Sequence, residues 1–418
     1  MRRSNRLSSQ RYFVGRKAEC RRHGVLTAWS VIAMVVCLAC VTLAVNSAYV
    51  AGLRAEGNRC AQTAALSAAR VLLSDDILKP DLQLFEVDAR YLRARQAAKS
   101  VHRIYRSQTN LPDFHDRSVA IGTLVSTPDG AMLLQHSMVP NFVQVVLSNV
   151  ADANGVGADR SGTLLLAGAS TVSQAKLFSR ARVSIQNRLI GFRPTSDCPI
   201  PMLGLAIPDA PNSSIAGQWS SDIEANTGGD RFEYSGLENT VSYGVDRLPE
   251  IVISIDEGSQ SGGPGKGRWI SYFQSDFQDD LNVADWTSGI SGSEEDSESL
   301  LTFPASATSC FLRNSDLDSM AVQFRSVIGQ PFIFPLYELP VDVSGTTVVA
   351  QADSRFGAAS ELTLTRVIAA RIVNVALAGT GELQVTLQPC VISTATAVTT
   401  SDSAVPANRY VWRIGASG

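Results

Sequence analysis

The sequence predicts an α+β fold in which an N-terminal transmembrane helix extends into a stalk and is followed by a β-rich extracytoplasmic region. Residues 25–45 carry no charged side chain and are rich in Val, Ala and Leu. At ~1.5 Å per residue this run reaches roughly 30 Å, the thickness of a hydrocarbon core. The helical pattern continues through residues 46–71 with polar positions, whereas most later segments show the alternation and β-branched content of strands.

The apolar run is expected to remain in the membrane as an anchor. It is longer than the ~7–15 apolar residues of a signal peptide, and no A-x-A cleavage site ends it. Basic residues dominate the sequence before it, so the N-terminus should be cytoplasmic and the region from Asn46 onward should lie outside. The residues that represent the anchor are Val25, Trp29, Ile32, Val36, Leu38, Val41 and Val45.

Length and charge limit the domains and the partners of the chain. A chain of 418 residues can hold two or three domains. Its net charge is -3 although its first residues are basic, so the remainder is acidic and no nucleic-acid partner is expected. Shifts in composition suggest a basic cytoplasmic tail at 1–24, the transmembrane helix at 25–45, the stalk and an amphipathic helix at 46–110, a first α+β domain at 111–210, an irregular Gly/Ser/Asp-rich region with strands at 211–310, and a C-terminal domain with a helix and a β-hairpin at 311–418.

Small residues mark one side of the stalk helix. Ala61, Ala64, Ala65 and Ala68 recur at helical spacing and would let another helix approach closely. They are candidate helix-packing residues, and self-association of the chain through the stalk helix would be one consequence. The alternative is that this side of the helix packs against the protein's own head.

Elements of both kinds follow the stalk. Residues 75–80 interrupt the helix, because the residue before a proline disfavours helical geometry. A charged amphipathic helix is expected at 82–107 and a short helix at 172–178. Strands are expected at 118–125, 132–135, 142–147 and 181–186.

The second half begins irregularly and ends with clear elements. Only 250–255 and 268–273 have strand character within the irregular region. A helix is expected over 315–328, since its apolar residues share one face and Gly329 is placed as a C-terminal stop. The apolar residues 332–334 follow it. The remaining expected strands are 362–377 and 383–387, joined by a turn at 379–381, and 410–414.

Four cysteines lie in the region that is expected to be extracytoplasmic. In an oxidising compartment they could form disulfides, and their wide spacing does not suit a zinc site. The candidate disulfide residues are Cys60, Cys198, Cys310 and Cys390, with the pairing left open. Cys60 lies on the stalk helix and could instead pair between two chains.

No arrangement of residues predicts a catalytic site. His102, His115 and His136 share no spacing that suits a metal ion or a nucleophile–base pair. The glycine-rich stretch 262–267 lacks the first glycine and the hydroxyl residue of a phosphate-binding loop, so a turn explains it better. We therefore expect no enzymatic activity, no cofactor and no metal ion.

Three short motifs around the membrane helix carry a family resemblance. They are Arg22-His23-Gly24 before the helix, Val45-Asn46-Ser-Ala-Tyr49 at its outer end, and Cys60-Ala-Gln62-Thr-Ala-Ala-Leu66-Ser-Ala-Ala69 after it. In order and spacing they resemble the leader region of the TadE/TadG-like proteins of the Flp (tight adherence) pilus-assembly system. Segments 188–194, 329–336 and 385–389 are similar to the longer, TadG-like chains.

The chain departs from the family pattern at four positions. Asn46 and Gln62 replace acidic residues, and Gly57 stands where a leucine is usual. Trp29 stands five residues after Gly24, where a pilin-type chain carries glutamate. Cleavage after Gly24 is therefore left open beside retention of the intact N-terminus.

The resemblance implies a membrane-anchored, outward-facing structural component of Flp/Tad-type pilus assembly, single-pass in the bacterial inner membrane. It implies action through protein–protein contacts, with other pilus-assembly or envelope proteins as partners and without catalysis. The alternative is a single-span extracytoplasmic binding or scaffold protein of the cell envelope with no pilus role. An anchored hydrolase is a third interpretation, which would need a pocket where a histidine faces an acid and a nucleophile.

Overall fold

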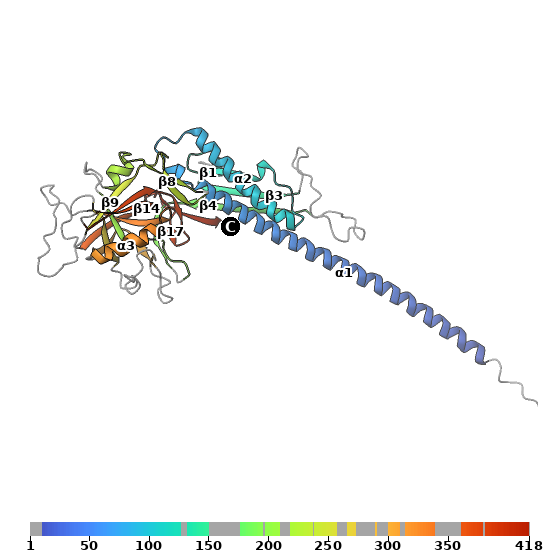
Figure 1. The fold of residues 1–418 in the computed structure, drawn as a ribbon. Coiled ribbons are helices and arrows are strands. Elements are labelled where there is room, and N and C mark those ends of the chain that lie inside the picture. The colour runs from blue at the N-terminus through green and yellow to red at the C-terminus, as the bar shows by residue number, and fades with distance from the viewer. Residues whose placement is uncertain are drawn as a thin grey trace, which may run out of the picture. The chain divides into compact units, whose positions relative to one another are not determined.

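The computed structural model describes residues 11–126, 132–149, 176–194, 197–209, 218–236, 238–256, 266–272, 289–290, 300–309, 314–338, 361–378 and 381–417. They form the α+β fold that the sequence predicts, with one long N-terminal helix and a β-rich remainder of several sheets (Figure 1). The chain divides into two compact units that alternate along the sequence. Unit 1 comprises Met1–Thr63, Lys99–Ser118 and Val145–Ala181, and unit 2 comprises Ala64–Ala98, Val119–Gln144 and Arg182–Gly418.

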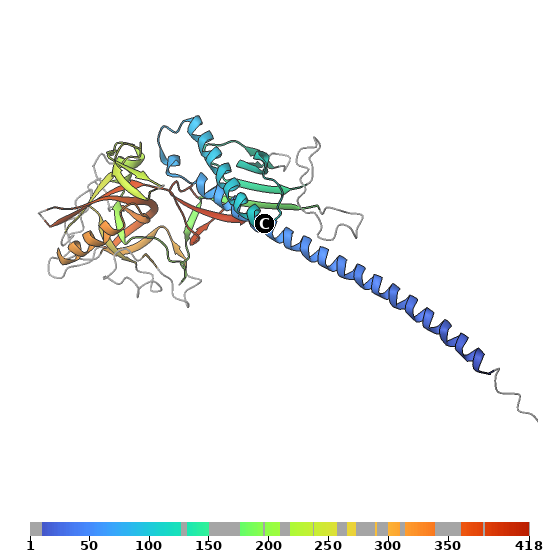
Figure 2. The same ribbon diagram turned by 45° about the vertical axis from the view of Figure 1, so that its right-hand side comes forward.

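The N-terminal helix is a single uninterrupted element. Helix α1 runs over Arg11–Leu72 without a break (Figures 1 and 2). Its 62 residues correspond to a length of ~93 Å. It begins within the basic segment that precedes the apolar run. The short 3-10 helix η1 (Asp75–Leu78) follows where a break is expected, and α2 (Leu84–Gln108) confirms the amphipathic helix.

A six-stranded sheet has the strand order β16-β18-β4-β3-β1-β2. Its members are β1 (Val119–Ser126), β2 (Met132–Gln135), β3 (Phe142–Ser148), β4 (Phe178–Gln186), β16 (Ile392–Ser393) and β18 (Val411–Ser417). The expected strands in these regions are confirmed. Alternate residues of β4 are buried, as the period-two pattern of its sequence predicts. Residues 172–175 of the expected short helix lie outside the described residues, and its last residue, Phe178, instead begins β4.

The second large sheet, in unit 2, closes part of itself into a ring. Its order is β12-β10-β6-β13-β14-β15-β9, with an additional pairing between β12 and β14. Because β12 pairs with β10 on one side and with β14 on the other, strands β12, β10, β6, β13 and β14 form a closed circuit. The strands are β6 (Leu205–Pro208), β9 (Ile251–Asp256), β10 (Arg268–Tyr272), β12 (Ala305–Ser309), β13 (Pro331–Glu338), β14 (Glu361–Ala378) and β15 (Glu382–Pro389).

Local sequence explains the elements around this ring. Helix α3 (Asn314–Ser326) is followed by Gly329, whose φ of +88° is the left-handed conformation that glycine adopts most readily. The hairpin of β14 and β15 turns at Gly381, with a φ of +76°, while the preceding turn residues 379–380 lie outside the described residues. Six consecutive residues of β13 are buried, so this strand reads as a continuous apolar run without alternation.

Short strands and turns complete unit 2. A three-stranded sheet has the order β11-β5-β17, and β7 pairs with β8 as a hairpin. These elements are β5 (Leu189–Phe192), β7 (Phe232–Ser235), β8 (Thr240–Tyr243), β11 (Leu301–Thr302) and β17 (Ala397–Thr399), with the π-helix η4 at Ser220–Glu224. The 3-10 helix η2 (Asp116–Ser118) belongs to unit 1. The region expected to be irregular therefore contains more strands than its composition predicts.

Candidate functional site

The first half of α1 exposes its apolar side chains. Exposure of the large apolar side chains ranges from 40% at Val45 to 70% at Leu43, with Trp29 at 67%, and none of the apolar window is buried. The other exposed anchor residues are Ile32, Val36, Leu38 and Val41, while the side chain of Val25 lies outside the described residues. Helix α1 is thus long and apolar enough to cross a membrane, where lipid would cover this surface.

From Asn46 onward one side of α1 is buried within the chain. Asn46 and Leu53 are each only 7% exposed, and Gly57 and Cys60 continue the same side one turn at a time. A Cβ atom at Gly57 would lie 2.5 Å from Oγ of Ser179. A leucine at this position would therefore collide with a neighbouring strand, which gives a physical reason for the glycine.

The four candidate packing alanines lie on the buried side. Ala61, Ala64, Ala65 and Ala68 have no exposed surface, so they already pack against other parts of the same chain. The structure therefore agrees with the alternative given above, in which the side of the stalk helix with small residues packs against the protein itself. A second helix would have to meet the opposite side of the stalk, where Arg59, Gln62 and Arg70 are exposed.

Two of the four candidate disulfide cysteines are buried, and neither forms a disulfide in the structure. Cys60 and Cys390 carry free thiols. Burial, together with the charge of Glu56, raises the pKa of Cys60 to about 11, and burial also raises the pKa of Cys390. Both groups therefore remain protonated thiols that pack as small apolar side chains. Cys198 is partly exposed, and Cys310 lies outside the described residues.

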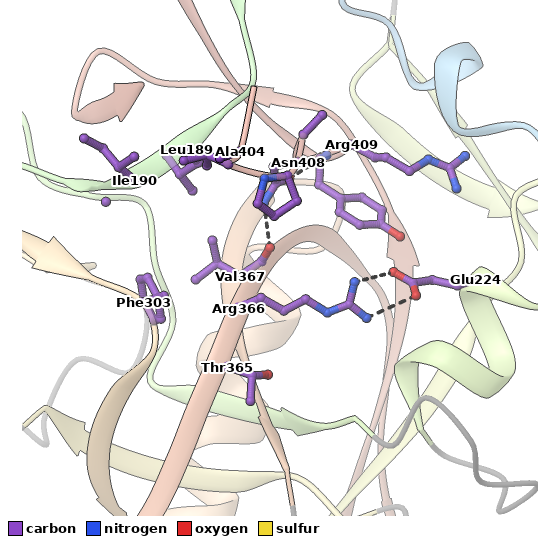
Figure 3. A pocket seen from close by; sticks show the side chains of 15 residues that line it. Leu189, Ile190, Glu224, Phe303, Thr365, Arg366, Val367, Ala404, Asn408 and Arg409 are labelled. Atoms are coloured by element: carbon purple, nitrogen blue, oxygen red, sulfur yellow. Dashed lines mark hydrogen bonds and ion pairs between the residues drawn. The ribbon is translucent and has the colours of Figure 1, made fainter. Parts of the chain in front are cut away.

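Unit 2 contains a cavity of about 560 Å³, which is within the size range of ligand pockets (Figure 3). Its walls come from β5, β14, the end of η4, Phe303 and the loop before β18. The lining residues are Leu189, Ile190, Gly191, Glu224, Phe303, Thr365, Arg366, Val367 and residues 404–410. Most of these side chains are apolar, and an ion pair between Arg366 and Glu224 supplies the polar end.

Arg366 is held between two carboxylates at that polar end. Its Nη1 lies 2.7 Å from Oε1 of Glu224 (Figure 3). Its Nη2 lies 2.8 Å from Oδ2 of Asp209. Burial lowers the pKa of Arg366, but the hydrogen bonds and charges of Glu224 and Asp209 outweigh burial and hold that pKa above its ordinary value. The guanidinium therefore stays charged, and its hydrogen-bonding capacity is used inside the protein.

Sequence reasoning did not identify this ion-pair cluster. Arg366 is 157 positions from Asp209 and 142 positions from Glu224, so no local motif links the three residues. The one available signal is Arg366 itself, a charged residue within a strongly β-branched strand. Such a residue needs a partner when the strand is buried.

The histidines are not part of either cavity wall found in unit 2. His102 is buried, and its Nε2 lies 2.7 Å from the carbonyl oxygen of Pro112. Burial lowers the pKa of His102. His136 lies 3.2 Å from the carboxylate of Asp88, and neither residue lines the 560 Å³ cavity or a smaller one of about 200 Å³. In neither of these two cavities does His102 or His136 face an acid and a nucleophile, which is the arrangement that an anchored hydrolase would require.

Carboxylates organise the loop between β8 and β9. Asp230 accepts the backbone N–H groups of Asp246 and Arg247, and Asp246 accepts that of Leu248. The side-chain amide of Gln388 lies 3.2 Å from Oδ2 of Asp246. Burial raises the pKa of Asp246 to about 6. The hydrogen bond from the backbone of Leu248 lowers this pKa, and the charge of Asp230 raises it.

The Asp246→Asn variant is expected to be more stable than the wild type at pH 7.5 and equally stable at pH 4. The folded-state pKa of about 6 lies above the ordinary value of 3.8, so the folded state binds the proton more tightly. That contribution to stability is complete below about pH 4 and is lost as the pH rises through 6. Because Asp246 is partly exposed, the difference should be about 1 to 2 kcal/mol.

Urea unfolding at both pH values would measure this difference. The exposed carboxylate of Asp81 provides the control, since Asp81→Asn removes an exposed negative charge and should change the stability by less than about 0.5 kcal/mol. An Asp246→Asn variant that is less stable at pH 7.5 would mean that the loop needs the negative charge.

Comparisons with known proteins do not add to this site. No family model, no curated protein and no solved structure matches the chain. Within the described residues, no group of three or more His, Cys, Asp or Glu side chains could hold a metal ion.

Proposed function

We propose that the protein is a membrane-anchored, outward-facing structural component of Flp/Tad-type pilus assembly that acts through protein–protein contacts. The proposal rests on the leader motifs around residues 22–69 and on the form of α1. It places the protein as a single-pass component of the bacterial inner membrane, with its basic N-terminal segment in the cytoplasm.

The observation that carries the proposal is the continuity of α1. One helix passes without interruption from an exposed apolar half to a half with a buried side. A span that continues without a break into a segment with a buried side would link the bilayer to folded parts of the chain through one helix. This arrangement suits a component that must present a surface to partners outside the membrane.

A binding or scaffold role in the cell envelope, without a pilus, is the second candidate. The cavity of about 560 Å³ in unit 2 favours it, because apolar walls with a single ion pair are typical of small-molecule sites. The two candidates share the anchor and differ in what the head contacts.

Mass spectrometry of sheared surface filaments and of washed inner membranes would test the proposal. The N-terminus of the protein is recorded in each fraction, beside a strain that lacks the gene. Protein in the filaments that starts at Val25 would identify a filament subunit, despite Trp29 in the position of the pilin glutamate.

An intact basic N-terminus found in membranes alone, together with loss of filaments in the deletion strain, would identify an anchor for assembly. Unchanged filaments in the deletion strain would contradict the pilus role and support the envelope scaffold. Protease protection of the N-terminal segment in spheroplasts would check the orientation.

A further inference from the structure

Arg54 is an exposed cation on the stalk just above the apolar run. It follows the buried residue Leu53 on α1, and its side chain is exposed. Residues Val50, Ala51, Gly57 and Asn58 occupy the helical positions from which an acid could pair with it. Within the described residues, Arg54 accordingly forms no ion pair or side-chain hydrogen bond.

The height of Arg54 above the bilayer follows from helix geometry. It lies nine positions after Val45, so its Cα lies about 13 Å beyond the end of the apolar run. Side chains of a helix lean toward its N-terminus, which here is the direction of the membrane. An extended arginine reaches roughly 6 Å from its Cα, so the guanidinium can come within about 7 Å of the hydrocarbon.

This height coincides with the headgroup layer. A bilayer of about 30 Å of hydrocarbon measures about 40 to 45 Å with its headgroups, which leaves about 5 to 8 Å on each side. Arginine binds phosphate through a planar fork of donors and is less strongly hydrated than lysine. Tyr49 lies one turn above Val45, at the level where aromatic side chains collect at membrane interfaces.

We propose that Arg54 binds lipid phosphate in the leaflet from which the stalk emerges and thereby fixes how far α1 sinks into the bilayer. The proposal rests on the membrane anchoring in the proposed function and does not depend on the pilus role. Arg59 provides an internal comparison. It lies about 21 Å beyond Val45, which is too far from the bilayer to reach the lipid phosphates. It also pairs with Glu56 at 3.1 Å.

Thiol labelling of a reporter cysteine at the interface tests the proposal. Ser47→Cys is introduced into the full chain, which is reconstituted in phosphatidylcholine vesicles with and without phosphatidylglycerol. A membrane-impermeant maleimide is added, and modification of residue 47 is quantified by peptide mass spectrometry. Native Cys60, which is buried, should stay unmodified in every variant and so reports an intact fold.

Arg54→Glu should raise the rate of labelling at residue 47 about fivefold, as expected for loss of one basic contact at a membrane surface. Arg54→Lys should retain most of the protection, and Arg59→Glu should leave the rate unchanged. Protection in both kinds of vesicle would identify the phosphate of zwitterionic lipid as sufficient. Protection only with phosphatidylglycerol would identify anionic lipid as the source of the phosphate.

Equal labelling rates for the wild type and Arg54→Glu in both kinds of vesicle would overturn the proposal. An equal rise in the Arg59→Glu variant would also overturn it, since the effect would then be general to charge on the stalk. Extraction of the wild type by alkaline carbonate would instead show that α1 does not span the bilayer. That result concerns the anchor and can be distinguished from a failure at Arg54 alone.

Discussion

Replacing Asp75 with alanine is expected to lower the free energy of unfolding by about 3 to 5 kcal/mol, the cost of leaving a buried charge without its partner. Oδ2 of Asp75 lies 2.5 Å from Nη1 of Arg371, whose side chain is only 8% exposed. Oδ1 accepts the backbone N–H of Val391 at 2.7 Å. The variant would lose both contacts and leave a guanidinium and an amide without acceptors inside unit 2.

The neighbouring carboxylate supplies the control for this experiment. Asp76 pairs with Lys79 and Arg93 at 2.8 Å, and the side chain of Arg93 is largely exposed. Asp76→Ala should therefore cost about 1 kcal/mol or less. Urea unfolding of the full chain in detergent would measure both variants.

A double variant separates the pair from its surroundings. Arg371 also lies over the ring of Tyr234, with 3.8 Å between the guanidinium carbon and the ring centroid. Adding Arg371→Met to Asp75→Ala should recover part of the lost stability, because no unpaired charge would remain. Equal costs for Asp75→Ala and Asp76→Ala would contradict the assignment of Asp75 as a buried structural partner.

Placing arginine at both Ile32 and Val36 should prevent stable insertion of α1 into the membrane. Both side chains are exposed on one side of the helix near the middle of the apolar run. An arginine at the centre of a span costs about 2.5 to 3.5 kcal/mol on insertion scales, so the pair should cost about 5 to 7 kcal/mol. The protein should then move from the carbonate-resistant membrane pellet to the supernatant.

The same change in the stalk should leave insertion intact. Ala51 and Ala55 are exposed and have the same four-residue spacing, but they lie beyond the apolar run. Their replacement by arginine should keep the protein in the pellet. Retention of the Ile32→Arg/Val36→Arg variant in the pellet would mean that these residues do not face lipid.

Local patterns account for the elements that the sequence predicts well. An uninterrupted apolar run, a glycine at the end of α3 and a β-branched hairpin around Gly381 each act within a few residues of one another. Strand β6 was not expected, because Leu205–Pro208 is short and ends in proline. It is specified instead by partners far along the chain in β10 and β13.

The candidate functional residues also fall into a group that local sequence predicts and a group that it does not. The proposed anchor residues follow from composition, because an uninterrupted apolar run of this length is enough to identify a helix that could cross a membrane. The burial of Ala61 and Cys60 and the cluster around Arg366 depend on which segments meet after folding. Contacts between segments that are far apart in the sequence leave no periodic pattern in it. The buried thiols and the ion-pair cluster are therefore found only in the structure.

The contact between Asp75 and Val391 also sets an order of events during synthesis. The two residues are 316 positions apart. At about 5 to 20 residues per second, the ribosome adds the second roughly 15 to 60 s after the first. During that interval α1 is complete, whereas the strands between it and Val391 are still being made. The nascent protein therefore passes through a stage with its apolar run available for insertion, and the six-stranded sheet can be completed only after β16 and β18 have been made.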